Sequence, residues 1–224
     1  YMKILFISLG CDKNLADSEE MLGLLTGNGH EIVDSEEEAD AIVINTCCFI
    51  HDAKEESVNT ILEMAEYKKT GTCKILIVTG CMAQRYKEEI TEEIPEVDAV
   101  LGTTSYGDIV KALNEAEAGH VFQEFKDINA LPEDSGRRVI TTGGHFGYLK
   151  IAEGCDKHCT YCIIPSLRGK FRSVPEERLL KQAEYMASQG VRELILVAQE
   201  TTVYGTDLYG KKTLHLLLKK LCQI

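Results

Sequence analysis

Three cysteines in one short segment are the side chains of this chain best suited to metal chemistry. Cys155, Cys159 and Cys162 follow a C-x3-C-x2-C spacing and are called the loop trio below. Four-iron clusters usually take four cysteine thiolates, so three thiolates would leave one iron without a protein ligand. An open position distinguishes catalytic from structural zinc sites, and the same logic applies to a cluster. The spacing therefore predicts an iron–sulfur cluster that does chemistry.

The main alternative is a zinc site, completed by His158 or by a residue distant in sequence. Zinc sites more often contain paired C-x2-C units, and only Cys159 and Cys162 have that spacing. We therefore favour the iron–sulfur cluster. In that interpretation His158 is a hydrogen-bond donor inside the loop and not a ligand.

The same segment has an aromatic residue, Tyr161, directly before its last cysteine, and it resembles the signature of the radical S-adenosylmethionine superfamily. The resemblance implies that the amino and carboxylate groups of S-adenosylmethionine bind the open iron. In that case we expect Tyr161 to pack beside the adenine. Arg168 and Arg172 are weaker candidates, for neutralising a carboxylate of the cofactor or the substrate. A structural tyrosine and solvated loop arginines are the alternatives.

Length and composition indicate a globular protein of a reducing compartment. With 224 residues, 44% of them hydrophobic, the chain suits one large domain or two modest ones. Nine cysteines without a secretory signal favour metal or catalytic sites over disulfides. No stretch is long and apolar enough to cross a membrane, so we expect a cytoplasmic protein.

Acidic residues are concentrated in the first half of the chain. Residues 1–119 contain 24 acidic and 9 basic side chains, a net charge of −15, whereas residues 120–224 contain 12 and 15, a net charge of +3. Binding to phosphate backbones relies on Lys and Arg. The first half therefore argues against a nucleic-acid partner and favours a basic protein, which its field would attract. The alternative is that the excess acid only keeps the protein in solution.

The sequence pattern predicts that a parallel sheet flanked by helices positions these residues. Short β-branched runs alternate with helical patterns over the first 118 residues, typical of an α/β, doubly wound, Rossmann-like domain. No G-x-G-x-x-G dinucleotide motif follows the first strand. The expected strands are Lys3–Leu9, Glu31–Asp34, Ala41–Asn45, Lys74–Thr79 and Ala99–Leu101, and the expected helices are Leu15–Gly27, Ala53–Lys69, Ala83–Glu93 and Tyr106–Ala118.

A second α/β unit follows a weakly patterned stretch. We expect a first domain at residues 3–118, a linker at 119–144 and a second domain at 145–224. These last residues would form about two repeats of a βα barrel, too few to close, so we expect the N-terminal part of a longer protein. The expected elements of the second domain are strand Phe146–Ala152, which leads into the loop trio, helix Glu176–Ser188, strand Glu193–Ala198 and helix Thr213–Leu221.

Three further cysteines follow three of the predicted strands, and they are called the sheet trio. Cys11 comes after the first strand, Cys47 after the third and Cys81 after the fourth. Because ligands bind at the carboxyl ends of parallel strands, we expect these thiols to converge in one crevice and hold a second cluster with an open iron. Cysteines that only fill a core are the alternative.

The other cysteines are assigned less directly. Cys48 competes with Cys47 as a ligand, and spacing alone does not choose between them. Cys73 precedes a strand, at the opposite edge of the sheet, and Cys222 lies in the last predicted helix. We expect Cys73 and Cys222 to be ordinary buried or free thiols.

The two trios together resemble the radical S-adenosylmethionine methylthiotransferase family over nearly the whole chain. Within that family the phrase Asn-Thr-Cys favours Cys47 over Cys48 as the ligand. Cys48 stands where the family often has a small residue such as glycine. The resemblance rests on Gly10-Cys-Asp-Lys-Asn14 with Asp17-Ser-Glu19, on Asn45-Thr-Cys47, on Gly80-Cys-Met-Ala-Gln-Arg85, and on Glu153-Gly-Cys155 through Cys162.

Several segments are similar to the RimO branch of this family, which modifies an aspartate of the small-subunit ribosomal protein uS12. The other branch modifies an adenosine of tRNA. The acidic first half agrees with a ribosomal-protein substrate, because ribosomal proteins are basic. The segments are Cys11-Asp-Lys-Asn14, Asn45 to Ile50, Ile163 to Ser173 and Ala198 to Tyr209.

The resemblance implies an enzyme with two [4Fe–4S] clusters and S-adenosylmethionine as cofactors. The cluster on the loop trio would split S-adenosylmethionine and yield a radical that removes hydrogen from the aspartate β-carbon. The cluster on the sheet trio would hold the sulfur that is methylated and joined to that carbon. The implied partners are the basic ribosomal protein and an external electron donor, with no membrane. The alternatives are a tRNA methylthiotransferase and a non-catalytic two-cluster electron carrier.

Overall fold

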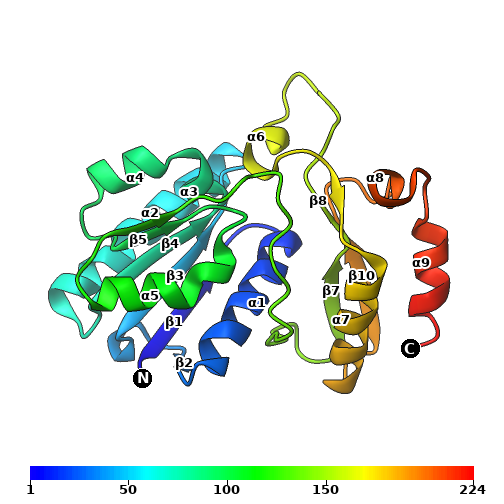
Figure 1. Ribbon diagram of the computed structural model, residues 1–224. Helices are drawn as coiled ribbons and strands as arrows, with labels where there is room; N and C mark the ends of the chain where they lie inside the picture. Colours follow the sequence, from blue (N-terminus) through cyan, green and yellow to red (C-terminus); the bar gives the residue numbers. More distant parts are fainter. The chain divides into compact units, whose positions relative to one another are not determined.

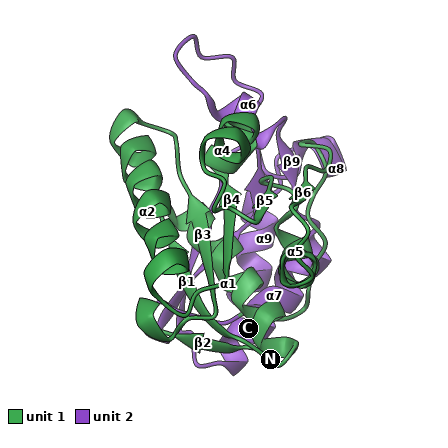
Figure 2. Cartoon of the chain, turned by 90° about the vertical axis from the view of Figure 1, so that its left-hand side faces the viewer, with its two compact units in different colours: residues 1–138 green, residues 139–224 purple.

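The computed structural model describes residues 1–224 and divides into two compact units, residues 1–138 and 139–224 (Figure 2). Unit 1 contains a six-stranded sheet, and unit 2 contains two separate strand pairs. No helix in either unit has both the length and the apolar character needed to cross a bilayer.

The sheet of unit 1 is parallel throughout, with strand order β2-β1-β3-β4-β5-β6. Its two central strands consist mainly of β-branched and other apolar residues, and all six residues of each are buried, the polar Asn45 included. Continuous apolar strands are expected where helices cover both faces of a parallel sheet. The strands are β1 (Lys3–Ser8), β2 (Glu31–Val33), β3 (Ala41–Thr46), β4 (Ile75–Gly80), β5 (Ala99–Leu101) and β6 (Phe122–Glu124).

Helices cover both faces of this sheet (Figure 1). Helices α1 (Asp12–Gly27) and α5 (Ile109–Glu117) pack against each other on one face, and α2 (His51–Thr70) packs against β3 and β4 on the other. The core between sheet and α1–α5 includes Met21, Leu25, Ile109 and Leu113. The shorter elements of unit 1 are η1 (Glu36–Glu38), α3 (Cys81–Arg85), α4 (Lys87–Glu93) and η2 (Tyr106–Asp108).

The strand order places a switch point between β1 and β3. From β1 the chain crosses to β2 on one side and then back past β1 to β3 on the other. In doubly wound sheets, ligands bind in the crevice outside the carboxyl ends of the strands where the winding reverses. The ends of β1 and β3 are therefore the favoured location for a site in unit 1.

The predicted doubly wound α/β fold is confirmed, with differences at several elements. The helix expected at Tyr106–Ala118 begins as η2 and continues as α5. The helix expected at Ala83–Glu93 is divided into α3 and α4, because Tyr86 has non-helical dihedral angles, φ −121° and ψ 36°. The helix expected from Leu15 begins at Asp12. Strand β6 was not predicted, since its three residues, Phe-Gln-Glu, include no β-branched residue and only one apolar residue.

Unit 2 begins as a strand–loop–helix–strand–helix sequence. Its β7 (Phe146–Lys150) and β10 (Glu193–Val197) pair in parallel, and α7 (Glu176–Ser188) lies between them in the chain. The expected strand Phe146–Ala152 is interrupted at Ile151. The remaining elements are β8 (Ala152–Glu153), β9 (Arg172–Ser173), α6 (Ile164–Arg168), α8 (Thr206–Tyr209) and α9 (Leu214–Leu221).

The predicted domain limits, residues 3–118, 119–144 and 145–224, stay a prediction. Within the stretch predicted as a linker, residues 122–124 pair with β5, and the division between the compact units falls after residue 138.

A buried ion pair fixes the last segment of unit 1 to α1. The Arg138 Nε and Nη2 atoms lie 2.8 and 2.6 Å from Glu19 Oε2, and both side chains are almost completely buried. The segment lies directly on the helix, since a Cβ atom at Gly23 would be 2.6 Å from the carbonyl oxygen of Arg137. Removing one partner of a buried pair leaves an uncompensated charge.

We predict strong coupling between these two residues. Arg138→Met or Glu19→Leu alone should lower the free energy of unfolding of unit 1 by about 3–5 kcal/mol. The double variant should lose much less than the sum, because it buries no unpaired charge. The exposed Arg137→Met is the control, with an effect within about 0.5 kcal/mol. Denaturant unfolding followed by circular dichroism measures all four, and additive losses would contradict the pairing.

Candidate functional site

The three cysteines of the sheet trio lie at the same edge of the sheet in unit 1. Cys11 follows β1 and is the N-cap residue of α1, Cys47 follows β3, and Cys81 begins α3 directly after β4. Cys47 and Cys81 are buried, and Cys11 is exposed. The trio therefore occupies the carboxyl end of the sheet, where the switch point lies, as the sequence predicts.

Two glycines turn the chain sharply from strand to helix at this edge. Gly10 and Gly80 precede Cys11 and Cys81 with φ angles of +90° and +92°, a region that glycine enters without strain. Both also allow close contact between loops. A Cβ atom at Gly80 would lie 2.3 Å from Asn45 Oδ1, and one at Gly10 would lie 2.6 Å from the Cβ and 2.9 Å from the Sγ of Cys47.

The backbone around Cys47 is held by two hydroxyl groups. Ser57 on α2 accepts a hydrogen bond from the Cys47 N–H at 3.0 Å and donates one to the Cys47 carbonyl at 2.7 Å. Thr46 donates to the carbonyl of Thr79 at 2.5 Å, which ties the end of β3 to the end of β4. Sequence reasoning did not find Ser57, because nothing in the sequence indicates that it lies beside Cys47.

Cys48 is the more deeply buried neighbour of Cys47. Burial, followed by the charges of Cys81 and Cys47, raises the pKa of the Cys48 thiol to about 12. It is Cys47 whose side chain lies against Gly10 and so beside the Cys11 loop. This contact favours Cys47 as the partner of Cys11, in agreement with the motif, and the ligand assignment itself stays a prediction.

The donor chemistry of the sheet trio fits an iron–sulfur cluster. Thiolates are soft ligands of the kind that such clusters take. No group of three or more Cys, His, Asp or Glu side chains has the geometry to hold a metal ion. The thiolates of a four-iron cluster surround the cluster and do not share one ion, so they need not converge on a point.

We predict that Gly10→Ala selectively disrupts this site. The new Cβ would displace Cys47 from the Cys11 loop. After anaerobic reconstitution, iron analysis should give about four irons per chain instead of about eight.

The matched control is Gly29→Ala. Gly29 also has a positive φ, +85°, but its Cβ position is open, with no atom within 4 Å. Backbone strain of about 1 kcal/mol is therefore common to both variants, and only Gly10→Ala should lose iron. Full iron content in Gly10→Ala would refute the close packing of the two loops.

The loop trio of unit 2 lies on the irregular segment between β8 and α6. Cys155 and Cys162 are half-buried and Cys159 is exposed. The Cys155 N–H donates to the Gly169 carbonyl at 3.1 Å, and the Lys157 N–H points at Cys155 Sγ at 3.4 Å. These bonds anchor the start of the loop, while Tyr161 is 90% exposed. Three thiols on an open loop again fit the donor set of a cluster.

A buried group of charged side chains lies directly before this loop. Glu153 is within 3.1 Å of Arg168 Nη1 and 3.4 Å of Lys150 Nζ, and all three residues are buried. Burial alone would raise the pKa of the Glu153 carboxyl, but the positive charges of Lys150, Arg168 and Arg172 outweigh burial and hold it below its usual value. Arg168 and Arg172 are therefore not solvated loop charges, which was the alternative for both.

The remaining cysteines stand apart from both trios. Cys73 is buried and its thiol donates to the Ile75 carbonyl at 3.3 Å, while burial raises its pKa. Cys222 is exposed after the end of α9. Both positions are compatible with the ordinary thiols expected from the sequence.

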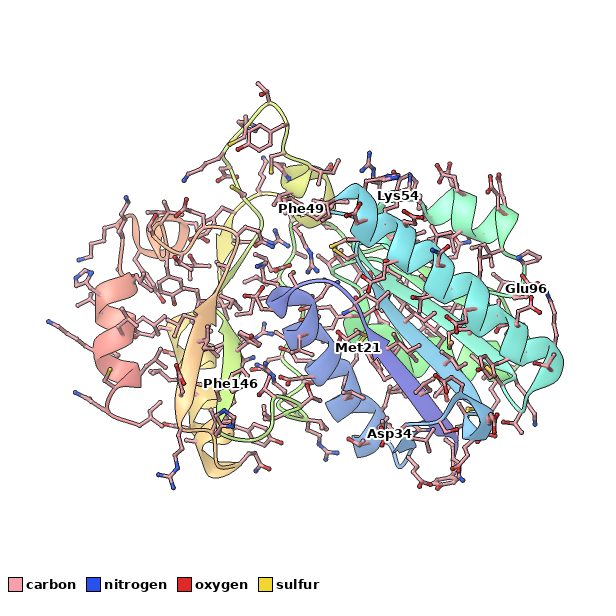
Figure 3. All side chains as sticks on the ribbon, turned by 180° about the vertical axis from the view of Figure 1, so that it is seen from behind. Met21, Asp34, Phe49, Lys54, Glu96 and Phe146 are labelled. Carbon is pink, nitrogen blue, oxygen red and sulfur yellow. The ribbon has the colours of Figure 1, made fainter.

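Two other surface features of unit 1 involve no residue of the sheet trio. The first is the side chain of Phe49, which is 55% exposed and comes two residues after Cys47. Figure 3 shows Phe49 and Lys54 at the start of α2 and Glu96 near the far end of that helix.

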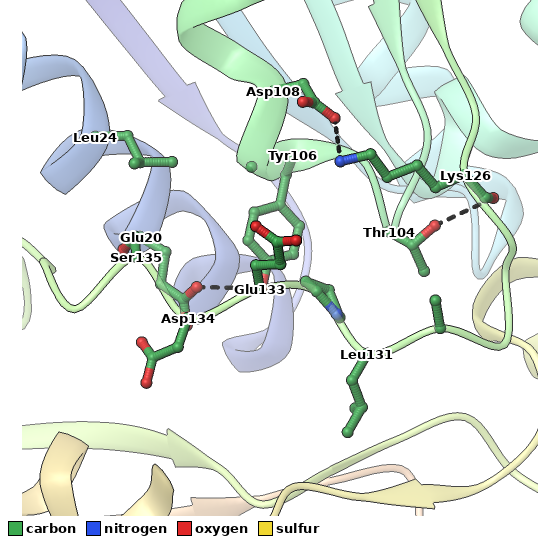
Figure 4. A pocket seen from close by; sticks show the side chains of 13 residues that line it. Glu20, Leu24, Thr104, Tyr106, Asp108, Lys126, Leu131, Glu133, Asp134 and Ser135 are labelled. Carbon is green, nitrogen blue, oxygen red and sulfur yellow. Dashed lines mark hydrogen bonds and ion pairs between the residues drawn. The ribbon is translucent and has the colours of Figure 1, made fainter.

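The second is a cavity of about 320 Å³ between α1, η2 and residues 130–135 (Figure 4). Its charged lining is Glu20, Asp108, Glu133, Asp134 and Lys126, which accounts for part of the acidic character of this unit.

Two family models match this chain, and each contains one trio. Residues 3–102 match an uncharacterized protein family, UPF0004, and residues 149–223 match the radical SAM superfamily. The first range includes the whole sheet trio, and the second includes the whole loop trio.

Curated relatives align with the chain over its full length. A protein of Lachnoclostridium phytofermentans is 66% identical over 223 residues, one of Clostridioides difficile is 51% identical over 223 residues, and one of Acetivibrio thermocellus is 50% identical over 229 residues. Each is named ribosomal protein uS12 methylthiotransferase RimO. These alignments cover 99–100% of this chain and 50–51% of the relatives, so the chain spans about half the length of the curated relatives it matches.

A solved structure shares the fold at low sequence identity. The cobalamin-dependent S-adenosylmethionine radical enzyme OxsB matches 99% of this chain and 37% of its own, with a TM-score of 0.54 and 15% identity. This likeness concerns the fold alone. The predicted order of the two domains is confirmed by the parallel sheet of unit 1 and by the radical SAM match at residues 149–223, which follows it in the chain.

Proposed function

We propose that this chain, which belongs to the radical S-adenosylmethionine methylthiotransferase family, forms part of an enzyme that adds a methylthio group to the β-carbon of an aspartate in ribosomal protein uS12. The observation that carries the proposal is the 66% identity, over all of the chain, to a protein named for this activity. The presence of both trios in the matching regions supports it.

In this proposal each trio holds one [4Fe–4S] cluster. When bound, the clusters and S-adenosylmethionine supply the radical and sulfur chemistry, and the protein supplies binding, orientation and exclusion of water. The sheet trio would hold its cluster between the ends of β1, β3 and β4. The loop trio would leave one iron open for the cofactor. The proposal also requires an external electron donor that reduces the cluster on the loop trio.

The buried charges of unit 2 would contribute to cofactor binding. Glu153 is paired with Lys150 and Arg168, and the charges of Lys150, Arg168 and Arg172 hold its pKa below the usual value. Cationic side chains near the cofactor favour the ionised form of a carboxylate, such as that of S-adenosylmethionine. Arg168 would act as one member of this group while it stays paired with Glu153. Tyr161 would contact the adenine only if the cofactor covers its exposed ring.

The acidic first unit supports a basic protein substrate over the tRNA alternative. A surface with a net charge of −15 over residues 1–119 attracts a cationic ribosomal protein and repels a polyanion. A cytoplasmic location, where ribosomes assemble and thiols remain reduced, is part of the same proposal. The electron-carrier alternative is weaker, since carriers of the ferredoxin type provide four cysteines for each cluster.

The first prediction from this proposal concerns metal content. The reconstituted chain should bind about eight irons with matching sulfide, and replacement of the whole loop trio by alanine should leave about four. Replacement of Cys11, Cys47 or Cys81 alone by alanine should in each case remove the other four irons. Iron and sulfide analysis measures these values.

Three cysteines serve as controls in the same experiment. Cys73→Ala and Cys222→Ala should leave the iron content unchanged. If Cys48→Ala removes the cluster and Cys47→Ala does not, the ligand assignment is wrong. Two tightly bound zinc ions and no iron would end the radical SAM proposal for this chain.

The second prediction concerns the substrate. The whole protein, given S-adenosylmethionine and a reductant, should methylthiolate an aspartate of uS12 and leave tRNA unmodified, as mass spectrometry of both would show. Because charge attraction is screened over about 8 Å at physiological ionic strength, binding of the ribosomal protein should weaken as salt is added. Methylthiolated adenosine with unmodified uS12 would place the protein in the tRNA branch.

A further inference from the structure

One buried amide side chain contacts all three loops that carry the sheet trio. Asn14 is the third residue of α1, three residues after Cys11, and it is 0% exposed. Its side chain is directed back toward the ends of β1, β3 and β4 by the contacts described next. It is thus placed among the cysteine loops without being one of the expected ligands.

The contacts of Asn14 reach each loop within two residues of its cysteine. Its Nδ2 donates to the Leu9 carbonyl at 3.0 Å and to the Thr46 carbonyl at 2.9 Å. Leu9 comes two residues before Cys11, and Thr46 directly precedes Cys47. Its Oδ1 lies 3.9 Å from Cys81 Sγ. A single planar group therefore fixes the spacing of the three loops.

Few side chains have the chemistry for this position. A primary amide has two N–H donors and one carbonyl acceptor on one small planar group. One donor is used on the buried Thr46 carbonyl and one on the partly buried Leu9 carbonyl, and the acceptor faces the thiol. Aspartate has the same shape and no N–H donor, so it would place an oxygen against each of the two carbonyls. Those carbonyls would lose their partners, and a buried polar group without a partner is destabilising.

The backbone of Asn14 is itself held in place. Its carbonyl accepts hydrogen bonds from Ser18 Oγ at 3.0 Å and from Asn45 Nδ2 at 2.9 Å. Asn45 Nδ2 also donates to Ser18 Oγ at 2.9 Å. Asn45 lies at the end of β3, two residues before Cys47. The amide is therefore fixed from both its side-chain and its main-chain ends.

We propose that Asn14 is the positioning residue of the first cluster: it sets the distances between the loops of Cys11, Cys47 and Cys81 and so pre-forms the cradle that the cluster enters. The inference rests on the proposed function, because it assumes that the sheet trio holds a cluster. Asn14 acts through the loops and needs no contact with substrate. Its loss should therefore alter the cluster before it alters the fold.

The test uses the whole chain with the loop trio replaced by alanine, so that only the first cluster is observed. Asn14→Asp removes the two donors and keeps the shape. Asn28→Asp is the matched control, since Asn28 lies at the other end of α1 and its Nδ2 donates to the Leu24 carbonyl at 2.8 Å in an exposed hydrogen bond. The readouts are iron content, the electron paramagnetic resonance spectrum and midpoint potential of the reduced cluster, and the thermal unfolding midpoint of the iron-free chain.

The parent and Asn28→Asp should bind about four irons with the same spectrum and potential. Asn14→Asp should reduce the fraction of chains that carry the cluster at least about fivefold, with any residual cluster shifted in spectrum and potential, while the iron-free chain still unfolds cooperatively. Full occupancy with an unchanged spectrum and potential in Asn14→Asp would overturn the inference.

Two further outcomes are decided in the same experiment. If Asn14→Asp does not fold, Asn14→Ser, which keeps one donor, takes its place: a shifted spectrum or potential supports the role of Asn14, and an unchanged cluster overturns it. If the parent binds no iron, the sheet trio is not a cluster site. That result removes the proposed function of the trio and the role of Asn14 together, and it is distinct from a failure of Asn14 alone.

Discussion

Unit 1 depends on the close approach of three loops at the carboxyl end of its sheet. The loops of Cys47 and Cys81 are buried there, so their backbone groups must find partners, because an unpaired buried polar group is costly. Asn14, Thr46 and Ser57 provide these bonds. Gly10 and Gly80 permit the approach, since any side chain at either position would overlap a neighbouring loop.

Contacts with the cysteine loops and with later segments of unit 1 explain why α1 carries buried polar residues where an amphipathic helix would carry apolar ones. Asn14 and Ser18 serve the cysteine loops, Glu19 receives Arg138, and Glu20 accepts a hydrogen bond from Tyr106 at 3.2 Å. One helix thus connects the candidate site at its first turn to the last segment of unit 1 farther along. The buried contacts of Ser18 and Glu19 therefore account for part of the motif Asp17-Ser-Glu19.

In unit 2 the corresponding constraint is electrostatic. Glu153 ends a strand immediately before the loop trio and is surrounded by Lys150, Arg168 and Arg172. Taking these charges out of water is costly unless they are paired. The pairing holds α6 and the start of the loop to β8, so the open loop of thiols begins from a fixed point.

The sequence alone predicted the sheet and the location of the sheet trio, because β-branched runs mark buried strands and the strand ends are marked by the cysteines themselves. It did not predict β6, which contains no β-branched residue, or the break at Tyr86, which depends on local dihedral angles. Nor did it find the pairing of Glu19 with Arg138, 119 residues apart, or the role of Ser57. These depend on tertiary contacts that leave no periodic signal.

The family resemblance predicted what spacing could not. The choice of Cys47 over Cys48 came from a motif, and the contact of Gly10 with Cys47 agrees with it. The assignment of Arg168 to a carboxylate was made without knowledge of its burial. Its pairing with Glu153 makes it part of a charge cluster, a property that only the folded chain reveals.

Mössbauer spectroscopy of the chain reconstituted with iron-57 tests the central claim most directly. The account predicts two [4Fe–4S] clusters, and addition of S-adenosylmethionine should shift the signal of one iron in about eight, the open iron of the loop trio. The shift should disappear when the loop trio is replaced by alanine. Two clusters whose Mössbauer signals do not change when S-adenosylmethionine is added would contradict the account and indicate an electron carrier.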